Sequence, residues 1–196
     1  MLAGVAFIVF PLLPMVMVMV LKLHPDVYPG SPFNVLGGVL FIATWLLLLA
    51  GLAGFHALLE ERYGLIGRAG FYTVIGGVFA HVVAVVAQEV VVGLTWGSTA
   101  LDFLAFLGLL VAMVGFVLYG AATLQARVLP RWCGVGFIVG LPVWRGIGTV
   151  SEYGGLLGGT IGWTLGGILF GLLWLALGYV LWSESGGAAE HPARAR

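Results

Sequence analysis

The sequence predicts an all-α integral membrane protein, a bundle of six transmembrane helices with both termini in the cytoplasm. Of its 196 residues, 61% are hydrophobic and only 8% are charged, whereas soluble proteins carry about 25% charged residues. So few polar side chains cannot cover a globule of this size, and lipid must therefore be the solvent for most of the chain. The other two observations are six apolar stretches of membrane-spanning length and the placement of the arginines.

The six apolar stretches are separated by short connections. They cover residues 2–23, 35–59, 69–92, 101–126, 132–150 and 160–182. The first lacks a basic N-terminal region and a small-residue cleavage site, so it is interpreted as a retained span rather than a secretory signal. Prolines and glycines, such as Pro25, Gly64 and Pro130, end the helices between the stretches. Residues 1–182 are thus expected to form one six-helix domain, and the polar residues 183–196 a disordered cytoplasmic tail.

The basic residues indicate the orientation. Six arginines fall on one side of the predicted bundle and only Lys22 and Arg145 towards the other. The six are Arg62, Arg68, Arg127, Arg131, Arg194 and Arg196. Because cytoplasmic loops of membrane proteins are enriched in Lys and Arg, both termini are predicted to be cytoplasmic. Aromatic rings agree, since Tyr63, Trp132, Tyr179 and Trp182 would then lie at the inner interface, and Tyr28, Trp96 and Tyr153 at the outer one.

The chain contains 32 glycines, which indicates close helix packing. Small residues allow two helix backbones to approach in lipid, where hydrophobic attraction between helices is weak. Gly70, Gly77 and Ala84 form one smooth stripe, and Gly154, Gly158, Gly162 and Gly166 recur every four residues. We expect these stripes to pack within one bundle, with a dimerisation face as the alternative. Pro11, Pro14 and Pro142 are expected to kink their helices.

Four polar residues in the apolar stretches form the predicted site. His81, Gln88 and Glu89 lie on or near one face of the third span, and Arg145 lies at a similar depth in the fifth. A carboxylate at membrane depth is costly unless it is paired, so Glu89 is expected to face the bundle interior and pair with Arg145. Asp102 and Glu152, near the outer ends, are competing partners. Such a group can carry protons, bind a small polar or anionic ligand, or only fix helix register.

Other chemistry finds little support in the sequence. His56 and His81 are the only histidines inside the apolar stretches, but their different depths disfavour a shared haem, so no cofactor is expected. Cys133 is the only cysteine, and the metalloprotease, hydrolase and phosphate-loop motifs are missing from the sequence, so no catalytic or metal-binding residue is predicted. The formal net charge of zero also disfavours nucleic-acid binding.

Three segments carry a family resemblance. They are Gly-Leu-Ala-Gly-Phe-His at 51–56 continuing through 60–70, Leu-Gln-Ala-Arg-Val-Leu-Pro-Arg-Trp at 124–132, and Leu-Ala-Leu-Gly-Tyr-Val-Leu-Trp at 175–182. Over spans two to six they resemble uncharacterised small multi-span bacterial membrane proteins of the domain-of-unknown-function kind. The resemblance implies a multi-pass protein of a bacterial plasma membrane. It implies no activity for particular residues.

The sequence therefore favours a non-enzymatic binding, sensing or transport unit whose centre is the polar cluster between spans three and five. The alternative is a membrane redox or lipid-modifying enzyme, or an accessory subunit of a membrane complex, in which the histidines act in proton transfer. The lipid bilayer is the expected partner, and a homo-oligomer or a larger membrane complex is left open.

Overall fold

The computed structural model describes residues 2–9, 11–13, 16, 32–91, 99–127, 129–154 and 159–190. Within these ranges all regular secondary structure is helical, which confirms the predicted all-α class for the described part of the chain. The helices are α1 (Leu2–Val9), α3 (Pro32–Leu59), α4 (Gly64–Val91), α5 (Thr99–Ala126), α6 (Arg131–Gly154) and α7 (Gly159–Glu190).

Five of these helices are long and apolar enough to cross a membrane. The qualifying segments are Val35–Leu59, Gly64–Gln88, Ala100–Ala126, Arg131–Ser151 and Leu165–Ser183. They correspond to predicted spans two to six. The first predicted span is represented by α1, whose eight residues end at Val9, just before Pro11. Most of residues 10–23 lie outside the described residues.

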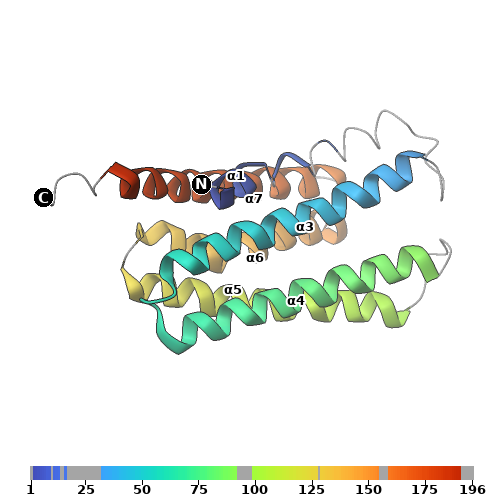
Figure 1. Ribbon diagram of the computed structural model, residues 1–196. Coiled ribbons are helices and arrows are strands. Elements are labelled where there is room, and N and C mark those ends of the chain that lie inside the picture. The colour runs from blue at the N-terminus through green and yellow to red at the C-terminus, as the bar shows by residue number, and fades with distance from the viewer. Residues whose placement is uncertain are drawn as a thin grey trace, which may run out of the picture.

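The helices pack as a closed ring. Neighbours in the sequence from α4 to α7 contact one another in turn, and α1 lies between α7 and α3. A lighter contact between α3 and α4 completes the circuit. Figure 1 shows the helices running roughly along one common direction, with the α3–α4 and α5–α6 turns at the same end of the bundle. We call this the arginine end, because Arg62, Arg68, Arg127 and Arg131 lie there. We call the opposite end, where α5 begins, the acidic end.

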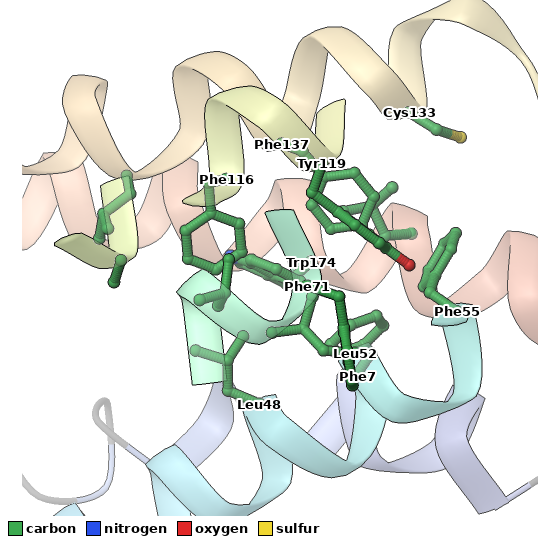
Figure 2. Packing of buried hydrophobic residues seen from close by; sticks show 14 of the residues in the cluster. Phe7, Leu48, Leu52, Phe55, Phe71, Phe116, Tyr119, Cys133, Phe137 and Trp174 are labelled. Atoms are coloured by element: carbon green, nitrogen blue, oxygen red, sulfur yellow. The ribbon is translucent and has the colours of Figure 1, made fainter. Parts of the chain in front are cut away.

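Aromatic side chains fill the middle of the ring (Figure 2). Five of them, one each from α1, α3, α5, α6 and α7, contact one another with ring centroids 4.7–6.3 Å apart. We call this group the aromatic plug; its members are Phe7, Phe55, Phe116, Phe137 and Trp174. At most 2% of each side chain is exposed. The plug therefore closes the bundle axis with apolar surface.

The α4–α5 contact depends on small residues. A Cβ added at Gly70 would lie 2.6 Å from the Tyr119 backbone nitrogen, and one added at Gly77 would lie 2.6 Å from the Gly108 carbonyl oxygen. Ala84 is fully buried on the same helix. The predicted stripe thus packs against another helix of the same chain, as expected for close backbone approach in lipid.

The second predicted stripe is divided between two helices. Gly154 is the last residue of α6, Gly158 lies outside the described residues, and Gly162 and Gly166 belong to α7. The spacing of four residues continues in the sequence but not along one helix, because the chain turns between α6 and α7. Gly162 and Gly166 nevertheless pack against α6, at Ser151 and Trp144.

Gly162→Leu is expected to lower the thermal unfolding midpoint in detergent more than Leu173→Ala. A Cβ at Gly162 would overlap the Ser151 side chain and lie 3.1 Å from the Ile147 carbonyl oxygen, so a leucine would force α6 and α7 apart. Leu173 is only half-buried and its loss leaves a modest cavity. Equal midpoints for the two variants would show that Gly162 tolerates a side chain.

The structure corrects two features of the predicted helix ends. Helix α7 continues to Glu190, so residues 183–190 are helical rather than the start of a disordered tail. Adding residues to an existing helix costs much less than starting one, which allows α7 to extend into the polar segment. Pro142 lies inside α6, which continues through it. Pro14 and residues 191–196 lie outside the described residues.

Candidate functional site

His81 is held between three helices in the half of the bundle nearer the acidic end. Its Nδ1 donates a hydrogen bond to the Ala105 carbonyl oxygen of α5, at 2.9 Å. Its ring contacts Trp45 of α3 edge-on, with centroids 5.1 Å apart, and lies 6.2 Å from the ring of Phe41. Because Nδ1 carries the proton in this bond, the neutral ring presents Nε2 as a hydrogen-bond acceptor.

The packing of glycines brings His81 to this position. A Cβ at Gly108 would lie 2.6 Å from the His81 backbone nitrogen, so α4 and α5 are in backbone contact beside the imidazole. Only this close approach allows a side chain of α4 to reach a carbonyl near the start of α5. Glycines that take no direct part in the site therefore determine where His81 lies.

Gln88 pairs with Asp102 nearer the acidic end. The Gln88 side-chain nitrogen Nε2 donates to Asp102 Oδ1 at 2.7 Å, and Asp102 is exposed. The sequence placed Gln88 with His81 and Glu89 and offered Asp102 only as a competing partner of Arg145. The structure instead assigns Asp102 to Gln88, because α5 runs antiparallel to α4 and its first turn lies beside the last turns of α4.

Arg145 of α6 approaches the same region. Its positive charge is within electrostatic range of the His81 imidazole. By helix rise of 1.5 Å per residue, His81 lies roughly 25 Å along α4 from Gly64 and Arg145 roughly 21 Å along α6 from Arg131. The similar depths agree with that proximity. The side chains of Glu89 and Glu152 lie outside the described residues, so their pairing with Arg145 stays a prediction.

A second polar group, not predicted from the sequence, lies towards the arginine end. The Tyr63 hydroxyl donates a hydrogen bond to His56 Nδ1. The His56 ring stacks on Phe71 of α4, with centroids 3.9 Å apart and 13° between the planes. The imidazole is half-buried. With Nδ1 accepting, the neutral ring carries its proton on Nε2.

The α3–α4 turn folds Tyr63 inward. Leu59 ends α3, and its carbonyl oxygen accepts hydrogen bonds from the backbone nitrogens of Arg62 and Tyr63. Gly64 then adopts φ +59°, the left-handed conformation that glycine adopts without strain. A Cβ at Gly67 would overlap the Tyr63 ring, so that ring lies directly over the glycine. Tyr63 is therefore only 6% exposed, although it lies in the turn at the arginine end.

Tyr119 of α5 connects this group to the aromatic plug. Its ring lies 5.5 Å from that of Tyr63 and 5.1 Å from that of Phe137. Its hydroxyl is fully buried and makes no hydrogen bond of normal geometry with the described residues. The Tyr63 hydroxyl is nonetheless close enough for each phenol to act on the other. An unsatisfied buried hydroxyl costs about 1–3 kcal/mol, which marks Tyr119 as a residue to explain.

Burial raises the pKa of Tyr63 to about 12, although the neighbouring Tyr119 hydroxyl partly opposes this shift. In unfolded chains the tyrosine pKa is about 10. The folded protein therefore keeps this proton at pH values where the unfolded chain loses it, and stability should fall as pH rises from about 10 through about 12.

We expect the thermal midpoint of the Tyr63→Phe variant to fall less steeply with pH over this range than that of the wild type. The variant lacks the titrating hydroxyl, while every other group is shared. Unfolding in detergent at pH 9.5, 10.5 and 11.5 measures both slopes. Parallel slopes would mean that Tyr63 titrates alike in the folded and unfolded chains.

The sequence suggested His56 as a haem ligand and, in the alternative interpretation, as a group in proton transfer, and it did not single out Tyr119. Helix spacing offered no signal, because α3 ends at Leu59 and Tyr63 lies in the turn that follows it. The structure gives the two histidines separate environments: Tyr63 and Phe71 surround His56, and Trp45 and Ala105 surround His81. Among the described residues, no group of three or more His, Cys, Asp and Glu could hold a metal ion. The expectation that no haem is bound stays a prediction.

Comparison with known proteins adds no further assignment. No family model, no curated protein and no solved structure matches the chain. The resemblance to small multi-span bacterial proteins therefore stays an expectation.

Proposed function

We propose that the chain is a multi-pass protein of a bacterial plasma membrane, with six spans and both termini in the cytoplasm, that acts as a non-enzymatic transport unit for a small polar or ionic solute. Large exposed apolar side chains support lipid as its partner, among them Leu46, Leu65 and Phe79, which are 60%, 83% and 67% exposed. The arginine distribution supports the orientation, in which the arginine end is cytoplasmic.

One observation carries the choice of transport over simple binding or sensing. Polar groups lie on both sides of the aromatic plug: His81 and Arg145 towards the acidic end, and His56, Tyr63 and Tyr119 towards the arginine end. A structural role for polar groups would need only one of these clusters to hold the helices in register. Two polar sites separated by a dry constriction form the layout of a closed permeation path, since apolar constrictions gate by excluding water.

The site nearer the acidic end is suited to receive the solute. His81 Nε2 offers an acceptor, Trp45 and Phe41 form an aromatic wall, and the exposed Asp102 with Gln88 lies towards the membrane surface. The charge of Arg145 lies close to His81 and adds a cationic group to the same region. We propose that solute enters from the outer side through this region.

Side-specific fluorescence tests this proposal. Trp45 touches His81, and an imidazolium quenches a neighbouring indole, so Trp45 should report protonation of His81. In proteoliposomes sorted for one orientation, lowering only the external pH from 8 to 5.5 should reduce the emission of the wild type. Trp45→Phe and His81→Gln should each remove this change, and lowering only the internal pH should not produce it. If His81 responds to neither side, the cluster is sealed and serves structure alone.

A further inference from the structure

We propose that the transported species is the proton, and that Tyr119, Tyr63 and His56 form a relay that carries it from the aromatic plug to the cytoplasmic surface. This proposal depends on the proposed transport function and names its substrate. Its starting point is Tyr119, whose hydroxyl is fully buried beside the plug and makes no hydrogen bond of normal geometry with the described residues.

The three side chains follow one another towards the arginine end, and each carries an exchangeable proton. Tyr119 lies beside Tyr63, with ring centroids 5.5 Å apart, and rotation of its hydroxyl onto the Tyr63 oxygen would make the hydrogen bond that the resting geometry lacks. The Tyr63 hydroxyl in turn contacts His56 Nδ1. His56 is half-buried, while Tyr119 is fully buried. The relay therefore runs from the closed axis to the arginine end and passes the proton on by exchange, so no ion has to move along it.

Each transfer leaves the side chains neutral. A hydronium ion on the plug side gives one proton to the Tyr119 oxygen and becomes water, as Tyr119 gives its own hydroxyl proton to the Tyr63 oxygen. Tyr63 gives its hydroxyl proton to His56 Nδ1, and His56 releases the proton of Nε2 to the cytoplasm. One proton has then moved, His56 has changed tautomer, and rotation of the hydroxyls with return of the His56 tautomer restores the first state. No buried phenolate forms, which avoids the large cost of an unpaired charge in the core.

The surroundings of the relay suit a proton better than a larger ion. The groups that face His56 are Glu60 on its own helix, Arg68 and Tyr72 from α4, and Tyr63 from the turn. The opposite charges of Glu60 and Arg68 leave no strong local field to hold a cation or an anion. Tyr119 is enclosed by rings, including those of Phe71 and Phe137, 6.3 and 5.1 Å from its own. A proton can pass such contacts by hydrogen-bond exchange, whereas a hydrated ion would have to displace the rings.

Proton uptake by proteoliposomes tests the relay. Liposomes are prepared with the wild type and with Phe116→Ala, a variant that shortens the plug. They hold a pH-sensitive dye, and a potassium gradient with valinomycin drives proton movement. We expect liposomes with Phe116→Ala to take up protons faster than protein-free liposomes. This holds whether or not the intact plug blocks proton passage in the wild type. Adding Tyr119→Phe or Tyr63→Phe should lower that rate at least about ten-fold, the scale lost when one proton-transfer group is removed.

Tyr72→Phe is the matched control. Tyr72 also contacts the His56 ring, with centroids 6.1 Å apart, but it is 65% exposed and its hydroxyl is outside the relay. It should leave the rate unchanged, and the thermal midpoint of each variant shows whether its fold is retained. Uptake that persists in folded Tyr119→Phe overturns the relay, and so does the lack of any uptake in Phe116→Ala. If Trp45 still responds to external pH in that last case, the transport proposal stands and only the proton assignment fails.

Discussion

Gly77→Leu is expected to separate α4 from α5 and to cause a large loss of stability. An added Cβ would lie 2.6 Å from the Gly108 carbonyl oxygen and 2.8 Å from the Ala112 Cα, both rigid backbone atoms. No side-chain rotation relieves such a contact. We expect a loss above about 3 kcal/mol, the upper end for overpacked sites, measured by denaturant titration in mild detergent. The hydrogen bond between His81 and Ala105 should break as well, since Gly108 packs on the His81 backbone.

The neighbouring glycine provides the control for this prediction. A Cβ at Gly76 would meet nothing within 4 Å, and Gly76 is exposed. Gly76→Leu makes the same chemical change one position along the same helix, and we expect it to alter stability by no more than about 0.5 kcal/mol. Gly→Leu raises helix propensity at both positions, so similar losses for the two variants would mean that a leucine anywhere on this helix, and not the α4–α5 contact, sets the cost.

Arg145→Gln and Glu89→Gln are expected to destabilise the bundle strongly as single changes and less than additively together. If the two side chains pair, removing either leaves the other as an uncompensated charge, which costs about 3–5 kcal/mol when the site is buried. The Arg145 charge is within electrostatic range of His81, although α6 itself packs chiefly on α5 and α7. Glu89 follows His81 by about two turns of the same helix.

A double-mutant cycle measures this coupling. Folding yield and denaturant midpoints of the two single variants and the double variant should give an interaction energy of about 1–3 kcal/mol. Glu61→Gln, an exposed change at the arginine end, should be additive with Arg145→Gln. Additivity of the Glu89 and Arg145 changes would instead indicate that Arg145 pairs with Asp102 or Glu152.

The sequence predicted the helices well because their signal is local. A long apolar stretch can be recognised without knowing which helices pack beside it. Predicted spans two to six accordingly agree closely with the five membrane-length helices described. The stripe of Gly70 and Gly77 could be predicted to pack, since close approach in lipid requires small residues. Its partner, the face of α5 with Gly108 and Gly115, could not be identified from spacing alone.

The site was only partly predictable because it depends on which helices lie side by side. His81 could be recognised as a polar residue that is costly to bury in an apolar helix. Its hydrogen bond to the Ala105 carbonyl, however, involves a backbone atom, which has no sequence signature. The pairing of Gln88 with Asp102 follows from antiparallel packing of α4 on α5. The burial of Tyr63 could not be predicted, because its inward turn depends on the left-handed Gly64 and the ring contact with Gly67.

Labelling of single cysteines in intact cells tests most directly the central claim, that the chain crosses the membrane with the His81 region towards the outside. Cys133 is the only native cysteine and is buried, so Cys133→Ala gives a background free of other thiols. Two exposed positions are then compared in it: Ala100→Cys, beside Asp102, and Glu61→Cys, at the arginine end. A membrane-impermeant maleimide should label position 100 in intact cells and position 61 only after the membrane is opened. Labelling of position 61 but not of position 100 in intact cells would contradict the account.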